Sequence, residues 1–193
     1  MLAKHELRRA AQAFFASTRA WQIVLAAVPV AADQVEVPVS MNDPLEQDLV
    51  RVEAAWFDGR KLGVASVSEL DSSEFGDWRA RTGAPTRFYQ MVPGVVCLYP
   101  TPTDAAETGL VFRVAAQPSD AATGIPNDMA VRFTDEIHEG AKARLMLYPN
   151  KPWTNLQLAG VHAGAFAAAT DSANLAAAKS FSTGRLVSRP KWC

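Results

Sequence analysis

The sequence lacks the residue patterns that most enzymes and metalloproteins need. It contains no G-x-S-x-G elbow, no G-x-x-x-x-G-K-[ST] phosphate loop and no G-x-G-x-x-G fingerprint. Its only histidines are His5, His138 and His162, and none has a second histidine at the zinc-peptidase spacing. Carboxylates at 135–139 fall where an amphipathic helix exposes its charged face. We therefore predict no catalytic residue, no metal site and no cofactor.

Cysteine, long apolar runs and excess charge are also scarce. The two cysteines, Cys97 and Cys193, are too few for a disulfide framework, and we expect free thiols in a reducing cytoplasm. The apolar run 21–32 has about half the length that a membrane-spanning helix needs, and no signal-peptide pattern follows the basic residues near the N-terminus. The net charge of −1 does not draw the chain onto nucleic acid or an anionic membrane. We predict no membrane contact.

What the sequence does contain is a composition typical of folded proteins and a clear order of elements. Of 193 residues, 49% are hydrophobic and 20% are charged, and the length suits one core or a core with a small second module. Leu7, Ala11, Phe14 and Thr18 recur every three or four positions and predict a helix over roughly residues 2–20. The period then changes to two.

The segment 33–117 has the alternation and turn residues of a small β-module. Alternating apolar residues at 35–39, 50–56 and 110–116 predict strands with one buried face. Asp58-Gly59 is a two-residue hairpin signal. Pro93-Gly94, between 87–91 and 95–99, predicts a second hairpin. Ser66 or Ser68 is expected to cap a short helical turn. We predict five or six short antiparallel strands.

Two long helices are expected after the β-module. Asn127 or Asp128 is the expected N-cap of the first, which Pro149 should end. Asn155 is the expected N-cap of the second, which should run to about Phe181. Trp153, in the short link between them, is expected to pack as a staple. The second helix is rich in alanine, which permits close helix approach, and we predict a subunit interface at four of these positions, namely Ala165, Ala169, Ala173 and Ala176.

The chain is therefore predicted to be α+β, with an N-terminal helix and two long C-terminal helices forming a helical body around an inserted antiparallel β-module. The predicted boundaries are 1–32 and 118–181 for the helical body, 33–117 for the β-module and 182–193 for an extended C-terminal arm. The arm is basic and carries apolar anchors, so it is expected to bind a neighbour rather than fray. Its proposed binding residues are Arg185, Leu186, Val187, Arg189, Lys191 and Trp192.

Several stretches in this order resemble the head-to-tail adaptor (connector) proteins of tailed bacteriophages, especially those of short-tailed phages. The similarity spans most of residues 3–181. It is carried by the opening helix with Phe14-Phe15-Ala16-Ser17-Thr18-Arg19-Ala20-Trp21, the hairpin 52–62, Ser68-Glu69-Leu70-Asp71 followed by Trp78, Gly83-Ala84-Pro85-Thr86-Arg87-Phe88-Tyr89, Leu98-Tyr99-Pro100, Arg113-Val114-Ala115, and the link 145–155 with Lys151-Pro152-Trp153.

The resemblance implies a structural virion protein of the head–tail junction, assembled on a capsid made in the host cytoplasm. About twelve copies would form a dodecameric ring beneath the portal. Its partners would be the portal protein, the tail nozzle protein and copies of itself, with genomic DNA passing through the lumen during ejection without specific binding. The arm 182–193 would reach the portal. The sequence leaves one rival open, a β-module that binds carbohydrate or single-stranded nucleic acid through exposed aromatic residues. An enzyme is the weakest interpretation.

Overall fold

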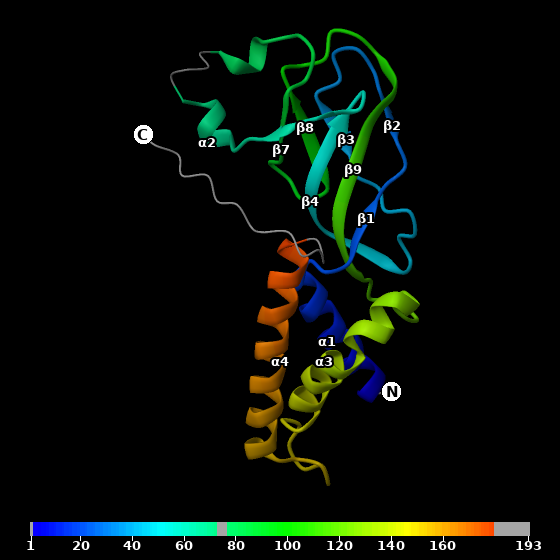
Figure 1. The fold of residues 1–193 in the computed structure, drawn as a ribbon, viewed down its shortest axis with the longest axis vertical. Coiled ribbons are helices and arrows are strands. Elements are labelled where there is room, and N and C mark those ends of the chain that lie inside the picture. Colours follow the sequence, from blue (N-terminus) through cyan, green and yellow to red (C-terminus); the bar gives the residue numbers. More distant parts are fainter. Residues whose placement is uncertain (1, 73–76, 180–193) are drawn as a thin grey trace. The chain divides into compact units, whose positions relative to one another are not determined.

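The computed structural model describes residues 2–72 and 77–179, and its element order confirms the predicted α+β class (Figure 1). Helices form the two ends of the described chain, and strands form the middle. The elements are α1 Leu2–Thr18, β1 Gln22–Val24, β2 Val28–Val30, β3 Glu36–Pro38, β4 Gln47–Phe57, β5 Arg60–Lys61, β6 Gly63–Val64, α2 Val67–Leu70, the 3-10 turn η1 Trp78–Ala80, β7 Arg87–Tyr89, β8 Val95–Tyr99, β9 Ala106–Pro118, α3 Asn127–Leu145 and α4 Leu156–Ala178.

The chain divides into two compact units. One comprises Met1–Trp21 with Gln117–Cys193, and the other comprises Gln22–Ala116. The sequence-based boundary at residue 33 differs from this division because residues 22–30 form β1 and β2, which pair with β9. Residues 22–30 give no strand signal in the sequence, because β1 and β2 have three residues each and are too short to show an alternation of apolar and polar residues.

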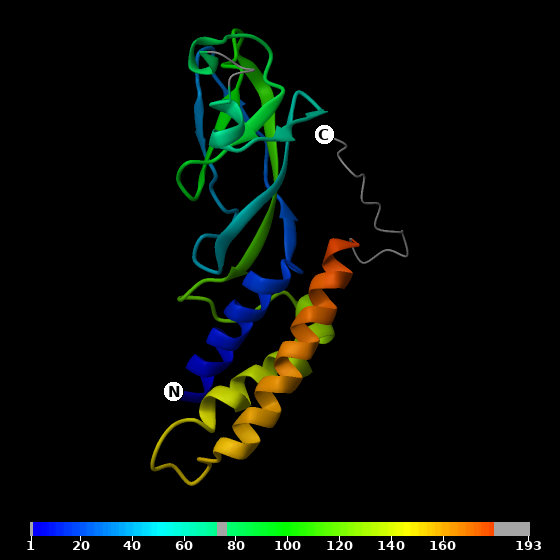
Figure 2. The same cartoon turned by 90° about the vertical axis from the view of Figure 1, so that its left-hand side faces the viewer.

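The helical unit is built on the packing of α1, α3 and α4 against one another, which both views show (Figures 1 and 2). Phe14 of α1 is fully buried, with its ring centroid 5.0 Å from that of Phe133 and 6.2 Å from that of Phe166. A Cβ on Gly140 would lie 2.7 Å from the Phe166 ring and 3.2 Å from the Ala10 Cβ. Gly140 therefore lets α3 approach α1 and α4 closely.

The ends of the long helices follow the predicted signals only in part. The Asn155 side chain caps α4 as predicted, with its Oδ1 accepting a hydrogen bond from Leu158 N at 3.0 Å. The cap of α3 was predicted wrongly, because Pro126 occupies the N-cap position and provides no side-chain cap. Asn127 is instead the first helical residue, since the fixed φ of the preceding proline suits a helix entrance. Helix α3 ends at Leu145, before Pro149.

The β unit consists of two sheets that share one core. The first has the order β1-β9-β4-β5, with β2 also paired to β9, and the second has the order β3-β8-β7-β6. Residues from both sheets form a single buried cluster that includes Val52, Phe88, Leu98, Leu110 and Phe112. One pair, β6 with β7, is parallel rather than antiparallel as predicted, because the connection from β6 passes through α2 and η1 before it returns.

Both predicted hairpins are confirmed. Asp58 and Gly59 have φ of 46° and 73° and join β4 to β5, as a type I′ turn requires. Gly94 has φ of 82° in the connection between the antiparallel strands β7 and β8. Ser66 caps α2, with its Oγ accepting from Glu69 N at 3.1 Å. Within the described residues, none of the helices combines the length and apolar character needed to cross a bilayer.

Candidate assembly surfaces

Helix α4 presents an apolar stripe that the helical unit leaves uncovered. The chain has no Asp, Glu, Lys or Arg between Lys151 and Asp171, so most of this helix carries no charge. Val161 is 65% exposed and Leu175 is 53% exposed. One face of α4 carries exposed apolar residues three or four positions apart, interrupted once by Ser172. We term these residues the outer stripe: Leu158, Val161, Ala165, Ala168 and Leu175. A helix that is apolar all round is normally buried.

The inner side of α4 packs on α1 and α3. Ala159, Ala173 and Ala177 are buried, and Phe166 lies against Gly140. This places the four predicted interface alanines at different depths. Ala165 is exposed, Ala169 and Ala176 are half-buried, and Ala173 is 7% exposed within the single chain. Ala165 thus offers a neighbour the most surface and Ala173 the least.

A polar cluster joins α3 to α4 beside the apolar contacts. Glu139 accepts a hydrogen bond from Lys142 Nζ at 2.8 Å, and its other oxygen lies 2.5 Å from His162 Nδ1. The bond from Lys142, followed by that to His162, lowers the pKa of Glu139 below its usual value. Sequence reasoning assigned Glu139 to a solvated face and missed His162, because no local spacing links residues 23 positions apart.

A buried carboxylate joins α1 to the segment that follows α3. Glu6 is 2% exposed, and its Oε1 accepts a hydrogen bond from the Tyr148 hydroxyl at 2.8 Å. Arg9 and His5 lie at 4.0 and 3.9 Å from the same oxygen. The bond to Glu6 raises the pKa of Tyr148. Buried charged groups are normally paired in this way, so a structural role accounts for the Glu6 carboxylate and no catalytic role is needed to explain it.

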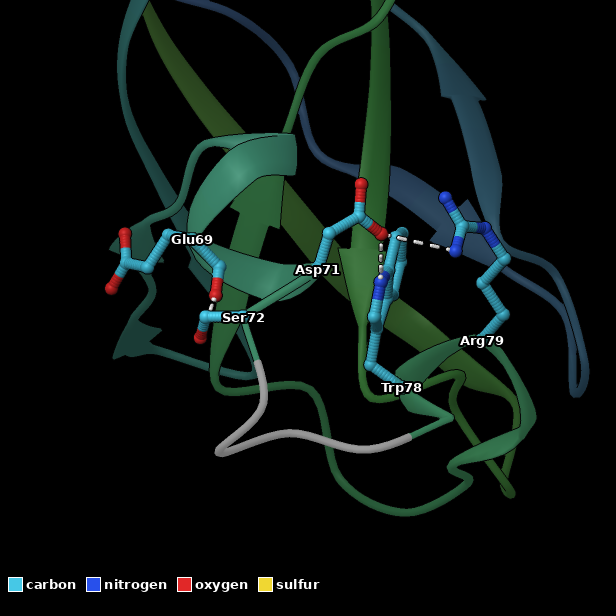
Figure 3. A network of polar contacts seen from close by, with 5 residues as sticks. All are labelled: Glu69, Asp71, Ser72, Trp78 and Arg79. Atoms are coloured by element: carbon cyan, nitrogen blue, oxygen red, sulfur yellow. Dashed lines mark hydrogen bonds and ion pairs between the residues drawn. The ribbon is translucent and has the colours of Figure 1, made fainter.

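Trp78 of η1 bonds to Asp71, the residue that follows α2 in the β unit. Figure 3 shows one carboxylate oxygen of Asp71 linked to both the Trp78 and the Arg79 side chains. The Asp71 Oδ1 accepts from Trp78 Nε1 at 2.7 Å and from Arg79 Nη1 at 3.1 Å, and the Arg79 guanidinium lies 4.2 Å from the Trp78 ring centroid. The bond from Trp78, helped by Arg79, lowers the pKa of Asp71. The indole packs edge-on against Tyr89, so it belongs to a core.

The aromatic residues that a carbohydrate or nucleic-acid site would need are mostly buried. Phe88, Tyr89, Tyr99 and Phe112 are at most 5% exposed. Burial beside Cys97 raises the pKa of Tyr89 to about 12, as expected for a phenol in an apolar environment. Among the described aromatic residues of the β unit, Trp56 and Phe57 on β4 are the two that are half-buried. Stacking on bases or sugars requires exposed rings, and most of the described rings of the β unit are buried in its cores.

Other predicted features have mixed outcomes. Trp153 is 47% exposed, so the prediction that it packs as a staple between the helices is wrong. The link 146–155 is held instead by its backbone, including a bond from Asn155 N to Met146 O at 3.1 Å.

In the parts of the chain that the structure describes, no group of three or more His, Cys, Asp or Glu could hold a metal ion. The predicted arm, with Arg185, Leu186, Val187, Arg189, Lys191 and Trp192, lies outside the described residues.

The sequence of this chain matches the model of a known protein family. The family model described as SU10 adaptor protein matches residues 6–189 of the 193 in this chain. No curated protein matches it. The family match covers both compact units, so it concerns the whole arrangement of helices and strands rather than one short motif.

Proposed function

The chain belongs to the SU10 adaptor protein family and is a phage adaptor, and from this membership we propose that it is a structural virion protein at the head–tail junction. About twelve copies assemble into a ring that joins the portal of the capsid to the nozzle of the tail. The genome passes through the ring during ejection. In this proposal the protein is not an enzyme and needs no cofactor.

The observation that carries the proposal, beside the family match, is the outer stripe of α4. Its residues Leu158, Val161, Ala165, Ala168 and Leu175 are exposed on a helix without charge from 156 to 170. Apolar surface of this kind is stabilised when a second surface covers it. A copy of the chain is the partner that an assembling ring supplies, and small residues such as Ala165 allow its backbone to approach closely.

The C-terminal residues 182–193 are proposed to be the arm that binds the portal. Leu186 and Val187 supply apolar anchors, Trp192 supplies a large aromatic, and Arg185, Arg189 and Lys191 supply charge. An aromatic side chain in a pocket is a common source of binding energy. Because the arm is repeated around the ring, many weak contacts become a strong attachment.

The lumen of the proposed ring lets DNA slide because the chain has no excess of positive charge. Each phosphate that a protein neutralises adds salt-dependent affinity, and several per subunit would hold the genome in place. The net charge of −1 fits passive passage. We expect weak binding of the free protein to duplex DNA at physiological salt. Tight binding that falls steeply with salt would contradict passive passage and favour a nucleic-acid-binding role.

Imaging and mass measurement with the portal test the proposal. Negative-stain images of the full chain mixed with its portal should show a ring added beneath the portal, at a mass that corresponds to many copies. Deletion of residues 183–193 should leave the fold intact and abolish attachment, and Trp192→Ala should weaken it. A protein that stays monomeric and never joins the portal would rule out the proposed function. A truncated chain that attaches normally would move the attachment site onto the helices.

A further inference from the structure

The helical unit contains a groove that none of the assignments above explains. It has a volume of about 320 Å³ and lies between α1, the first half of α3 and the segment 118–125. Its apolar lining includes Leu7, Ala11, Ile125 and Ile137. Ligand pockets usually span roughly 300–1,000 Å³, so this groove can take one or two side chains but not a folded element.

The groove has a positive rim. Lys4 and Arg8 are among the lining residues, together with His138, whereas none of the lining residues is Asp or Glu. Arg8 is held at the rim by donating to the backbone carbonyl of Asp120, and Gln12 engages the carboxylate of the same residue at 3.0 Å. A fitting occupant therefore presents an apolar side chain with acidic neighbours.

The β unit carries a turn with that chemistry. Leu45 is 72% exposed, the highest value for a large apolar residue in that unit. It sits in a turn closed by a bond from Gln47 N to Asp43 O at 2.9 Å. The flanking acids are Asp43, Glu46 and Asp48, and there is no basic residue between 41 and 50. The hairpin tip at Met91, which is 59% exposed, has no charged neighbour and does not match the rim.

We propose that the groove of one copy binds the Leu45 turn of a second copy. Leu45 enters the apolar floor, and Asp43 and Asp48 approach Lys4 and Arg8. The two surfaces are different, so the contact is heterologous and repeats from copy to copy until the assembly closes. This assignment rests on the proposed self-assembly of the chain, to which it adds a second interface beside the outer stripe.

Site-directed crosslinking tests the juxtaposition. In the full chain with Cys193→Ser, Asn42→Cys beside the turn and Thr134→Cys in the groove should be joined by a short bis-maleimide into a ladder of covalent oligomers. Met91→Cys with Thr134→Cys is the matched control and should give no ladder. A turn that crosslinks only within its own chain, or a control pair that gives an equal ladder, would overturn the proposal.

Charge exchange tests the chemistry by sedimentation of the full chain over a range of concentrations. Lys4→Glu or Asp48→Lys should each weaken association about tenfold, and the two together should restore it. Leu45→Ser should also weaken it about tenfold or more, whereas Lys61→Glu on β5, with the same charge change as Lys4→Glu, should leave it unaltered. Unchanged association in all variants, with portal binding intact, refutes only this contact. A wild-type chain that does not bind the portal would instead refute the proposed function.

Discussion

Helices α3 and α4 have similar lengths and both pack on α1, yet their outer faces are opposites. Helix α3 has seven Asp, Glu, Lys or Arg residues in 19 positions, and α4 has one in 23. Asp135 on α3 and Val161 on α4 are both exposed. The charged face of α3 is stable in water, whereas the uncharged outer stripe of α4 gains free energy when it is covered.

The contrast shows that fold and assembly place separate demands on a helix. The inner faces of α3 and α4 meet through Gly140 and Phe166, and this contact fixes the fold. The outer faces are free to differ because neither contributes to that core. A change on the outer stripe of α4 should therefore alter assembly without altering stability, and a change on an inner face should do the reverse.

The largest expected effect is on assembly through α4. Val161→Glu leaves the fold stable, since the side chain is 65% exposed. In an assembled interface the new carboxylate would be buried without a partner, at a cost of about 3–5 kcal/mol, so association should fall more than 100-fold. Sedimentation measures the association, and thermal unfolding measures the fold.

Two controls sharpen this first comparison. Val64→Glu changes the same residue type at 66% exposure on β6 and should not weaken association. Asp135→Lys changes the charge on the outer face of α3 and should also have no effect. If Val161→Glu assembles like the wild type, the outer stripe is not a subunit interface, whatever the behaviour of the controls.

The second effect is on stability through the inner faces. Gly140→Val would place its Cβ 2.7 Å from the Phe166 ring, so the helices must separate, at a cost of about 2–3 kcal/mol. Gly160→Val on α4 is the matched control, because a Cβ there meets nothing within 4 Å. Chemical unfolding should show a loss only for Gly140→Val. Equal losses would mean that backbone effects, not packing, set the result.

The features that sequence reasoning found are those with local signals. The Asp58-Gly59 hairpin, the Ser66 cap and the Asn155 cap are each specified within a few residues, and the structure has all three. The alternation at 50–56 and 110–116 also marked the strands that form the centre of the first sheet. Local sequence signals therefore predicted most elements and the α+β class.

The features that sequence reasoning missed depend on distant partners. Strands β1 and β2 are identified only by pairing with β9, whose paired residues lie far along the chain, as in Gln22 with Ala115 and Val30 with Ala106. The Glu139–His162 contact and the groove beside Ile137 need the packed helices. Ala173 looked equivalent to Ala165 in the sequence, because an alanine-rich helix does not reveal which of its faces is covered.

A third and smaller effect concerns the hydrogen bond that joins α1 to the segment after α3. Tyr148→Phe removes the hydrogen bond to Glu6, a carboxylate that is 2% exposed. Leaving that buried acceptor without its donor should cost about 1–2 kcal/mol and lower the Tm. Glu6→Gln keeps an acceptor of similar shape and should cost less. A Tyr148→Phe variant as stable as the wild type would mean that the Glu6 carboxylate reaches another donor.

The smallest expected effect is the pH dependence of the contact between α3 and α4. Lys142 and then His162 hold the pKa of Glu139 below its usual value of 4.5, so the folded state favours the ionised carboxylate. Its stabilisation is present above pH 4.5 and is lost as the pH falls through the lowered pKa. Glu139→Gln should therefore be slightly less stable than the wild type at neutral pH, and the gap should close in acid. Solvent screens this cluster, so the gap should also shrink in high salt.

Glu136→Gln, on the same helix but without an ion pair among the described residues, is the control and should show no such gap. Thermal unfolding from pH 3 to 7 measures all three chains, and a gap that persists unchanged at the acid end would show that shape, not charge, makes Glu139 useful.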